Sequence, residues 1–221
     1  MTKRVLVACE YSGILRQAFK SLGWDAWSCD LIPTEQEGQH YQGDVNDILN
    51  DGWDMLCAFP PCTYLCSSGM HWTIRGLRDP KLTDDALSFV RLLMDAPINH
   101  ILIENPVGCI STKIRKPDCI IQPWQFGHPE AKKTCLWLKN LPVLQPTNIL
   151  PLPLSGRWEN QTGTGQNRLA PSKNRWKARS RTYQGIADAI AFQYTTFWNR
   201  DSDLPAKLKR RPSTQGRSPL S

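Results

Sequence analysis

Residues 4–30 read RVLVACEYSGILRQAFKSLGWDAWSCD, a stretch that joins two strand patterns to one helix pattern. Val5 to Cys9 is a short apolar run of the kind found in buried strands. From Gly13 to Leu22 the apolar residues recur on one face of a helix, and Gly23 is a typical residue to end it. Trp24 to Asp30 then predicts a second strand. A strand, a helix and a strand in this order favour a parallel α/β sheet.

The same alternation continues through residue 105. Asp54–Ala58 and His100–Glu104 are two further strand patterns, and between them a helix is predicted over Thr83–Asp95, with Thr83 as its N-cap. Cys119–Phe126 and Thr134–Leu138 are strand patterns joined by a turn, which indicates an antiparallel hairpin. The predicted fold class is therefore α/β and Rossmann-like, a mostly parallel sheet with an antiparallel edge hairpin.

Composition divides the chain into four segments. Residues 1–138 carry the alternating pattern and form the predicted core. Residues 139–182 are rich in Pro, Gly, Asn and Gln, and we expect a long functional loop or a minimal subdomain there. Residues 183–199 contain a helical pattern over 184–194, and residues 200–221 are typical of a disordered basic tail.

The positive charge lies in the C-terminal third. The chain has 221 residues and a net charge of +7, yet residues 1–156 hold 14 basic and 16 acidic side chains. Residues 157–182 hold seven basic and one acidic, a net of +6, mixed with tryptophan and asparagine. Basic charge mixed with aromatic and amide groups favours a nucleic-acid partner. An ordinary solvated surface is the alternative.

The eight cysteines are expected to be reduced. Five of them lie in or beside strand-like apolar segments, where a free cysteine behaves as a small hydrophobic residue. No apolar run of the kind found in a signal peptide follows Met1–Arg4, and no apolar stretch of the sequence is long enough for a membrane span. These features predict a cytoplasmic protein without a membrane partner.

Polar residues follow the predicted strands at their carboxyl ends, the edge at which α/β sheets bind ligands. They are Glu10, Tyr11, Ser12 and Gly13 after the first strand, Asp30 after the second, Pro61 and Cys62 after the third, and Glu104 and Asn105 after the next. The turn Tyr11-Ser12-Gly13 opens a helix, so its backbone can wrap a cofactor made of a nucleoside and an amino acid. Asp30 is placed to bind ribose hydroxyls and Asp44 an adenine amino group, although both are also ordinary cap or turn residues.

Cys62 has the setting of a nucleophile. It follows a strand directly and is preceded by two prolines, so its backbone is rigid and its sulfur partly exposed. A zinc site formed by Cys57, Cys62, Cys66 and His71 is the alternative. Cys57 should point into the sheet, however, and the spacing lacks the paired C-x₂-C knuckle, so no metal is predicted.

The motifs Pro61-Cys62 and Glu104-Asn105-Pro106 resemble the proline–cysteine and Glu-Asn-Val motifs of the cytosine-C5 DNA methyltransferase family. The first strand and turn resemble the cofactor motif of that family, and residues 182–191, Thr-Tyr-Gln-Gly-Ile-Ala-Asp-Ala-Ile-Ala, resemble its C-terminal helix motif. Short bacteriophage members have similar Pro-Pro-Cys and Glu-Asn-Pro versions. The resemblance covers roughly residues 1–138 and 180–196.

The resemblance implies an S-adenosyl-L-methionine-dependent methyltransferase fold and methyl transfer to C5 of cytosine in DNA, in the cytoplasm of a bacterium or a phage-infected host. Cys62, held by Pro61, would add to cytosine C6. Glu104, with Asn105 beside it, would hold a proton against N3, and the base would be flipped out of the duplex. Residues Glu10, Tyr11, Ser12, Gly13, Asp30 and Asp44 would hold the cofactor.

The chain departs from the family pattern in three places. The first motif has one glycine, in Cys9-Glu10-Tyr11-Ser12-Gly13, which adds Glu10 to the cofactor residues. The Gln-x-Arg motif of the family has no clean match, so Lys132 or Lys133 is expected to take the place of its arginine. The recognition domain is reduced to residues 139–182, whose substrate contacts are predicted at Arg175, Lys177 and Arg179.

Two other functions remain open on the sequence alone. The small recognition segment also fits the same chemistry on RNA or on a free cytosine nucleotide. A catalytically silent nucleic-acid-binding protein that retains the fold is the second alternative, which the pairing of Cys62 with Glu104 disfavours.

Overall fold

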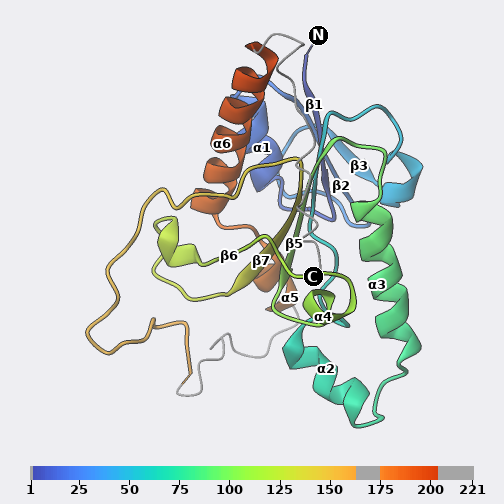
Figure 1. Cartoon of the computed structure of the whole chain (residues 1–221), viewed down its shortest axis with the longest axis vertical. Coiled ribbons are helices and arrows are strands. Elements are labelled where there is room, and N and C mark those ends of the chain that lie inside the picture. Colours follow the sequence, from blue (N-terminus) through green and yellow to red (C-terminus); the bar gives the residue numbers. More distant parts are fainter. Residues whose placement is uncertain (1, 163–174, 204–221) are drawn as a thin grey trace, which may run out of the picture.

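The computed structural model describes residues 2–162 and 175–203, and within them seven strands form one sheet in the order β3-β2-β1-β4-β5-β7-β6 (Figure 1). The strands are β1 (Arg4–Ala8), β2 (Asp25–Asp30), β3 (His40–Gln42), β4 (Met55–Ala58), β5 (His100–Pro106), β6 (Cys119–Ile121) and β7 (Thr134–Lys139). The first five are parallel to one another, whereas β7 pairs antiparallel with β5 and with β6. The predicted Rossmann-like sheet with an antiparallel edge is confirmed.

Helices cover both faces of the sheet (Figure 1). They are α1 (Ile14–Ser21), α2 (Ser67–Ile74), α3 (Lys81–Met94), α4 (Ile110–Lys113), α5 (Arg175–Ser180) and α6 (Gln184–Asp203), with 3₁₀ turns at Val45–Asp47 and Pro123–Gln125. Helices α1 and α6 pack together on one face, and α3 covers the other. In the described ranges, none of the helices combines the length and the apolar character that a bilayer span requires.

The side chains of β1 point alternately to the two faces of the sheet, and this explains why helices pack on both faces. Val5 and Val7 join the core cluster under α1 and α6, whereas Leu6 and Ala8 join the cluster under α3. Successive side chains of a strand point to opposite faces, so a continuous apolar run is buried on both sides.

Several element boundaries differ from the predictions. Helix α3 begins at Lys81, two residues early, and Pro80 is its N-cap, so the prediction of Thr83 as the cap is wrong. The Thr83 hydroxyl lies in the first turn of the helix and is buried, with no hydrogen-bond partner among the described residues. Strand β6 ends at Ile121 because Pro123 opens a 3₁₀ turn. Helices α2, α4 and α5 and strand β3 were not predicted.

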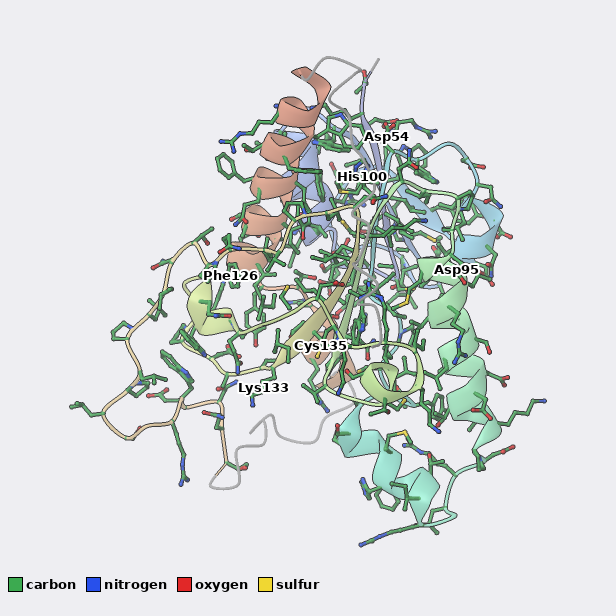
Figure 2. The ribbon with its side chains drawn as sticks, in the orientation of Figure 1. Asp54, Asp95, His100, Phe126, Lys133 and Cys135 are labelled. Carbon is green, nitrogen blue, oxygen red and sulfur yellow. The ribbon has the colours of Figure 1, made fainter. Side chains whose placement is uncertain are left out.

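The order of the strands reverses at β1, because β2 lies on one side of it and β4 on the other. Ligands of open α/β sheets bind at such a switch point, beyond the carboxyl ends of the strands. Figure 2 labels Asp54 and His100 near the amino ends of β4 and β5, and Lys133 and Cys135 toward the opposite edge. That opposite edge carries the candidate site.

Arg16 on α1 anchors the loop that follows Asp30. The side chain is fully buried, and its guanidinium donates to Ser28 Oγ at 2.8 Å, to the carbonyl oxygen of Gln36 at 2.6 Å and to that of Glu37 at 3.2 Å. These hydrogen bonds hold loop 31–39 against α1, and Asp30 lies immediately before this loop.

Arg16→Met should lower the free energy of unfolding by about 1–3 kcal/mol, because it removes the donor of three hydrogen bonds, of which the one to Ser28 Oγ is buried. Chemical denaturation measures this. Arg91→Met on the exposed side of α3, where the arginine donates to one carbonyl oxygen, is the control and should cost less than about 1 kcal/mol. Equal losses in the two variants would contradict the anchoring role of Arg16.

Candidate active site

A cavity of about 670 Å³ opens at the carboxyl edge of the sheet. The ends of β1, β2, β4 and β5 line it, together with Lys132, residues 179–183 and two isoleucines of α6. Of the predicted site residues, it brings together Tyr11, Asp30, Asp44, Pro61, Cys62, Glu104, Lys132 and Arg179. One cavity thus spans the predicted cofactor and substrate positions.

The loop that carries Cys62 is held from two sides. Where β4 ends, the Phe59 amide donates to the carbonyl oxygen of Ala8 at 3.0 Å. Asn105, fully buried at the end of β5, donates from Nδ2 to the carbonyl oxygen of Pro60 at 2.7 Å. Cys62 remains partly exposed to the cavity. Asn105 therefore positions the loop that carries Cys62 and does not line the cavity.

Glu104 presents its carboxyl group to the same cavity. Burial raises the pKa of this carboxyl, while the positive charge of Lys132 and a hydrogen bond with Thr134 pull it down in part. A carboxyl with a raised pKa keeps a proton at higher pH and can donate it to a ring nitrogen. The antiparallel pairing of β5 with β7 brings Thr134 to this place, opposite Pro106.

The structure distinguishes the two candidate lysines. Lys132 lies in the cavity wall, its Nζ donates to the carbonyl oxygen of Arg179 at 2.9 Å, and it lies 5.8 Å from the ring centroid of Tyr183. Lys133 is not among the residues that line the cavity. Lys132 is thus the lysine placed to act beside Glu104.

The other half of the cavity contains three of the predicted cofactor residues, Tyr11, Asp30 and Asp44. Asp30 lines it, and burial raises the pKa of its carboxyl, against backbone hydrogen bonds that lower it. Asp44 also lines it, although its carboxylate caps a 3₁₀ turn by accepting from the Asn46 amide at 2.9 Å. Cys9 has a left-handed backbone with φ of 58°, a strained conformation that clusters at ligand sites.

Glu10, Ser12 and Gly13 form the N-terminus of α1 and do not line this cavity. The buried Glu10 carboxylate accepts hydrogen bonds from the Ser12 hydroxyl and from the Ile14 amide, so its side chain caps the helix. Gly13 has φ of 74°, and a β carbon there would lie 2.7 Å from Arg16 Nη2. Of this turn, Tyr11 alone faces the cavity, and its hydroxyl donates to the carbonyl oxygen of Lys177 at 2.7 Å.

Residues 177–183 form a segment that we call the strap, and most of it lies in the cavity wall. Arg179, Ser180, Arg181, Thr182 and Tyr183 all line it, and Arg181 pairs with Glu35 at 2.8 Å. Lys177 lies over the Tyr11 ring at 5.7 Å from the centroid and outside the cavity wall. The side chain of Arg175, residues 163–174 of the predicted recognition segment and residues 204–221 of the predicted tail lie outside the described residues.

The alternative zinc ligands do not come together. Cys57 is buried in the core cluster under α1 and α6, whereas Cys62 and Cys66 line the cavity. Within the described ranges, no group of three His, Cys, Asp or Glu side chains could hold a metal ion. All eight cysteines, each within those ranges, are free thiols.

Sequence reasoning missed several cavity residues. They are Phe59, Cys66, Trp72, Arg78, Thr134 and Tyr183. Cys66 had a visible signal, since it lies four residues after Cys62, one helical turn away. The others lie after β4, on or after α2, on β7 and in the strap, and whether they reach the cavity depends on contacts between segments distant in sequence.

Comparison with known proteins gives distant likenesses of fold. No family model matches the chain, and no curated protein matches it. A solved structure assigned as a DNA modification methyltransferase encoded within an E. coli prophage is 16% identical, with a TM-score of 0.46, over 70% of this chain and 54% of that one. The Entamoeba histolytica methyltransferase EhMeth is 17% identical, also with a TM-score of 0.46, over 68% of this chain and 58% of that one.

This chain therefore spans little more than half the length of either solved structure. At these TM-scores the likeness carries no weight for activity. A conclusion about function therefore has to come from the residues that line the cavity.

The pH dependence of the free energy of unfolding should show that Glu104 is buried. Because its folded pKa is raised, protonation stabilises the fold fully below the unfolded pKa, ordinarily about 4.3, and this stabilisation is lost as pH rises through the folded pKa. Glu104→Gln should therefore unfold at higher denaturant concentration than the wild type at pH 8 and at equal concentration at pH 4. Glu37→Gln on the surface is the control. A wild type as stable as Glu104→Gln at pH 8 would contradict the burial.

Proposed function

We propose that this protein transfers a methyl group from S-adenosyl-L-methionine to C5 of cytosine in DNA, through a covalent bond between Cys62 Sγ and C6 of the ring. The observation that carries the proposal is the convergence of Cys62, Glu104 and Lys132 on one cavity that also contains Asp30. This reaction requires a nucleophile, a proton donor and a cation, beside a carboxylate that binds the ribose of the cofactor.

The cofactor half of the cavity fits the donor. Asp30 offers a carboxylate to ribose hydroxyls, Asp44 can accept from an adenine amino group, and Leu31, Val45 and Phe59 supply apolar walls for the adenine ring. The cavity volume of about 670 Å³ lies in the range of sites for small molecules and cofactors. When bound there, the cofactor supplies an electrophilic methyl group on a sulfonium.

The residues of the other half prepare the cytosine. C5 is a poor nucleophile until a group adds at C6, and Cys62 Sγ makes that bond as a thiolate. Glu104, whose pKa is raised by burial, holds a proton against N3, so the ring accepts the electrons of the new bond. Lys132 lies beside Glu104 and supplies positive charge at the ring. After methyl transfer, loss of the C5 proton and release of Cys62 restore the aromatic ring.

Positive charge at the cavity favours a polyanionic substrate. Arg78, Lys132, Arg179 and Arg181 line it, from three separate parts of the chain. Cationic side chains near a reactive pocket bind phosphates and make affinity salt-dependent. A target base in duplex DNA must be flipped out to reach Cys62. Transfer of labelled methyl to duplex DNA, RNA and dCMP in parallel separates DNA from the other two substrates.

Cys62→Ser should abolish methyl transfer to DNA while leaving the binding of S-adenosyl-L-methionine nearly unchanged. The hydroxyl of serine has a high pKa and cannot replace a thiolate in the attack on C6, although it is close in size. A filter assay with labelled donor measures transfer. Cys119→Ser, at a half-buried free cysteine outside the cavity, is the control. A serine variant that retains near-normal transfer would overturn the proposed mechanism.

Asp30→Ala should weaken binding of S-adenosyl-L-methionine at least about tenfold. The carboxylate would lose hydrogen bonds to ribose hydroxyls, each worth about 1.5–3 kcal/mol, and about 1.4 kcal/mol corresponds to a factor of ten. Calorimetry measures the affinity, and Asp51→Ala on the surface is the control. Unchanged affinity in Asp30→Ala would remove the end of β2 from the donor site.

A further inference from the structure

The cavity holds a second thiol, Cys66, to which the proposed reaction gives no role. The amides of Leu65 and Cys66 donate to the carbonyl oxygen of Cys62 at 3.0 and 2.9 Å, which closes one helical turn between the two cysteines. Both thiols line the cavity, and each shifts the pKa of the other. The nucleophile therefore has a thiol neighbour on the same loop.

The backbone of Cys66 is fixed by the chain that follows β5. The Ser67 amide donates to the carbonyl oxygen of Val107 at 3.0 Å, and Cys66 forms an antiparallel bridge with Gly108. A β carbon at Gly108 would lie 1.9 Å from the carbonyl oxygen of Leu65, so only glycine permits this contact. Strand β5, through Asn105, and the chain that follows it thus hold the two members of the thiol pair.

The surroundings of Cys66 favour a thiolate there. It is the N-cap residue of α2, 9% exposed, and its Sγ lies 3.2 Å from the Ser68 hydroxyl. A hydrogen bond from the Cys62 thiol lowers the pKa of Cys66 to about 5, and bonds from Ser68 and the Gly69 amide add to this against the effect of burial. Thiols at helix N-termini ionise in the same way.

The same hydrogen bond acts in the opposite direction on the nucleophile. It raises the pKa of Cys62, and burial and the charge of Glu104 on β5 raise it further. The cations that face the pair are Lys132, ahead of β7, and Arg179 on α5, and the Cys109 thiol lies on the turn beyond β5. A shared proton is a property of the pair and of neither thiol alone.

We propose that Cys66 is a positioning residue that accepts the proton of Cys62, so that the attacking thiolate forms inside the cavity. This inference rests on the proposed cytosine chemistry. At the start the two sulfurs share one proton and one negative charge. When Cys62 Sγ bonds to C6, the proton stays on Cys66 Sγ. When that bond breaks, its electron pair returns to Cys62, and the sulfurs again share one proton. The C5 proton leaves to water.

The test is the rate at which iodoacetamide alkylates Cys62 in the full-length protein between pH 6 and 9.5, followed by peptide mass spectrometry. In the wild type we expect a rate that is flat between pH 7 and 9, because the pair has already lost one proton. In Cys66→Ser and Cys66→Ala the rate should rise tenfold per pH unit up to a pKa of about 8.5 or higher, the ordinary range of cysteine. At pH 7 it should be at least about tenfold slower than in the wild type.

Serine at position 66 separates proton acceptance from packing, because its hydroxyl can donate a hydrogen bond but cannot hold the charge. Cys119→Ser is the matched control and should give the wild-type profile. Coinciding profiles for the wild type and Cys66→Ser would overturn the proposal. A wild-type alkylation rate that rises tenfold per pH unit between pH 7 and 8.5 would also overturn the proposal. This second result is measured on the wild type alone and does not depend on whether the variants fold. Neither methyl donor nor nucleic acid is present, so failure of the proposed methyl transfer leaves this outcome unaffected.

Discussion

A hydrogen bond of 2.7 Å from Asn105 Nδ2 to the carbonyl oxygen of Pro60 connects the two strands on which the site depends. Asn105 is fully buried, so water does not compete for this bond. On one side of it, Glu104 reaches the cavity from β5. On the other, Pro61 and Cys62 follow β4. The distance between the Glu104 carboxyl group and the Cys62 thiol is therefore set by the register of two adjacent parallel strands.

That register is a consequence of the core. Leu56 of β4 lies opposite Ile101 of β5, and both are buried under α3. A slip by one residue would exchange the side chains that a strand packs against its two covered faces, so both core clusters would have to repack. The antiparallel strand β7 then brings Thr134 beside Glu104, and Lys132 ahead of it completes the group. The apolar pattern that specifies the sheet thus also specifies the geometry of the site.

Much of this could be predicted from the sequence, because it depends on patterns that are local. The apolar runs indicated the parallel strands, and the polar residues at their ends indicated Cys62, Glu104 and Asp30. Glu10 was expected at the cofactor, but its carboxylate caps α1, a choice that depends on where Ser12 and Ile14 fall in the folded turn. The choice of Lys132 over Lys133, and the strap that brings Arg181 and Tyr183, depend on contacts between segments distant in sequence. The local pattern of apolar and polar residues does not predict such contacts.

The most direct test of the central claim is the mass of the intact protein after incubation with S-adenosyl-L-methionine and duplex DNA that contains 5-fluorocytosine. Fluorine at C5 prevents the final elimination, so the bond between Cys62 Sγ and C6 should persist. We expect a species heavier by the mass of the methylated DNA strand, and a digest that maps the modification to Cys62. A protein that binds this DNA and forms no adduct, or an adduct on a different cysteine, would contradict the account.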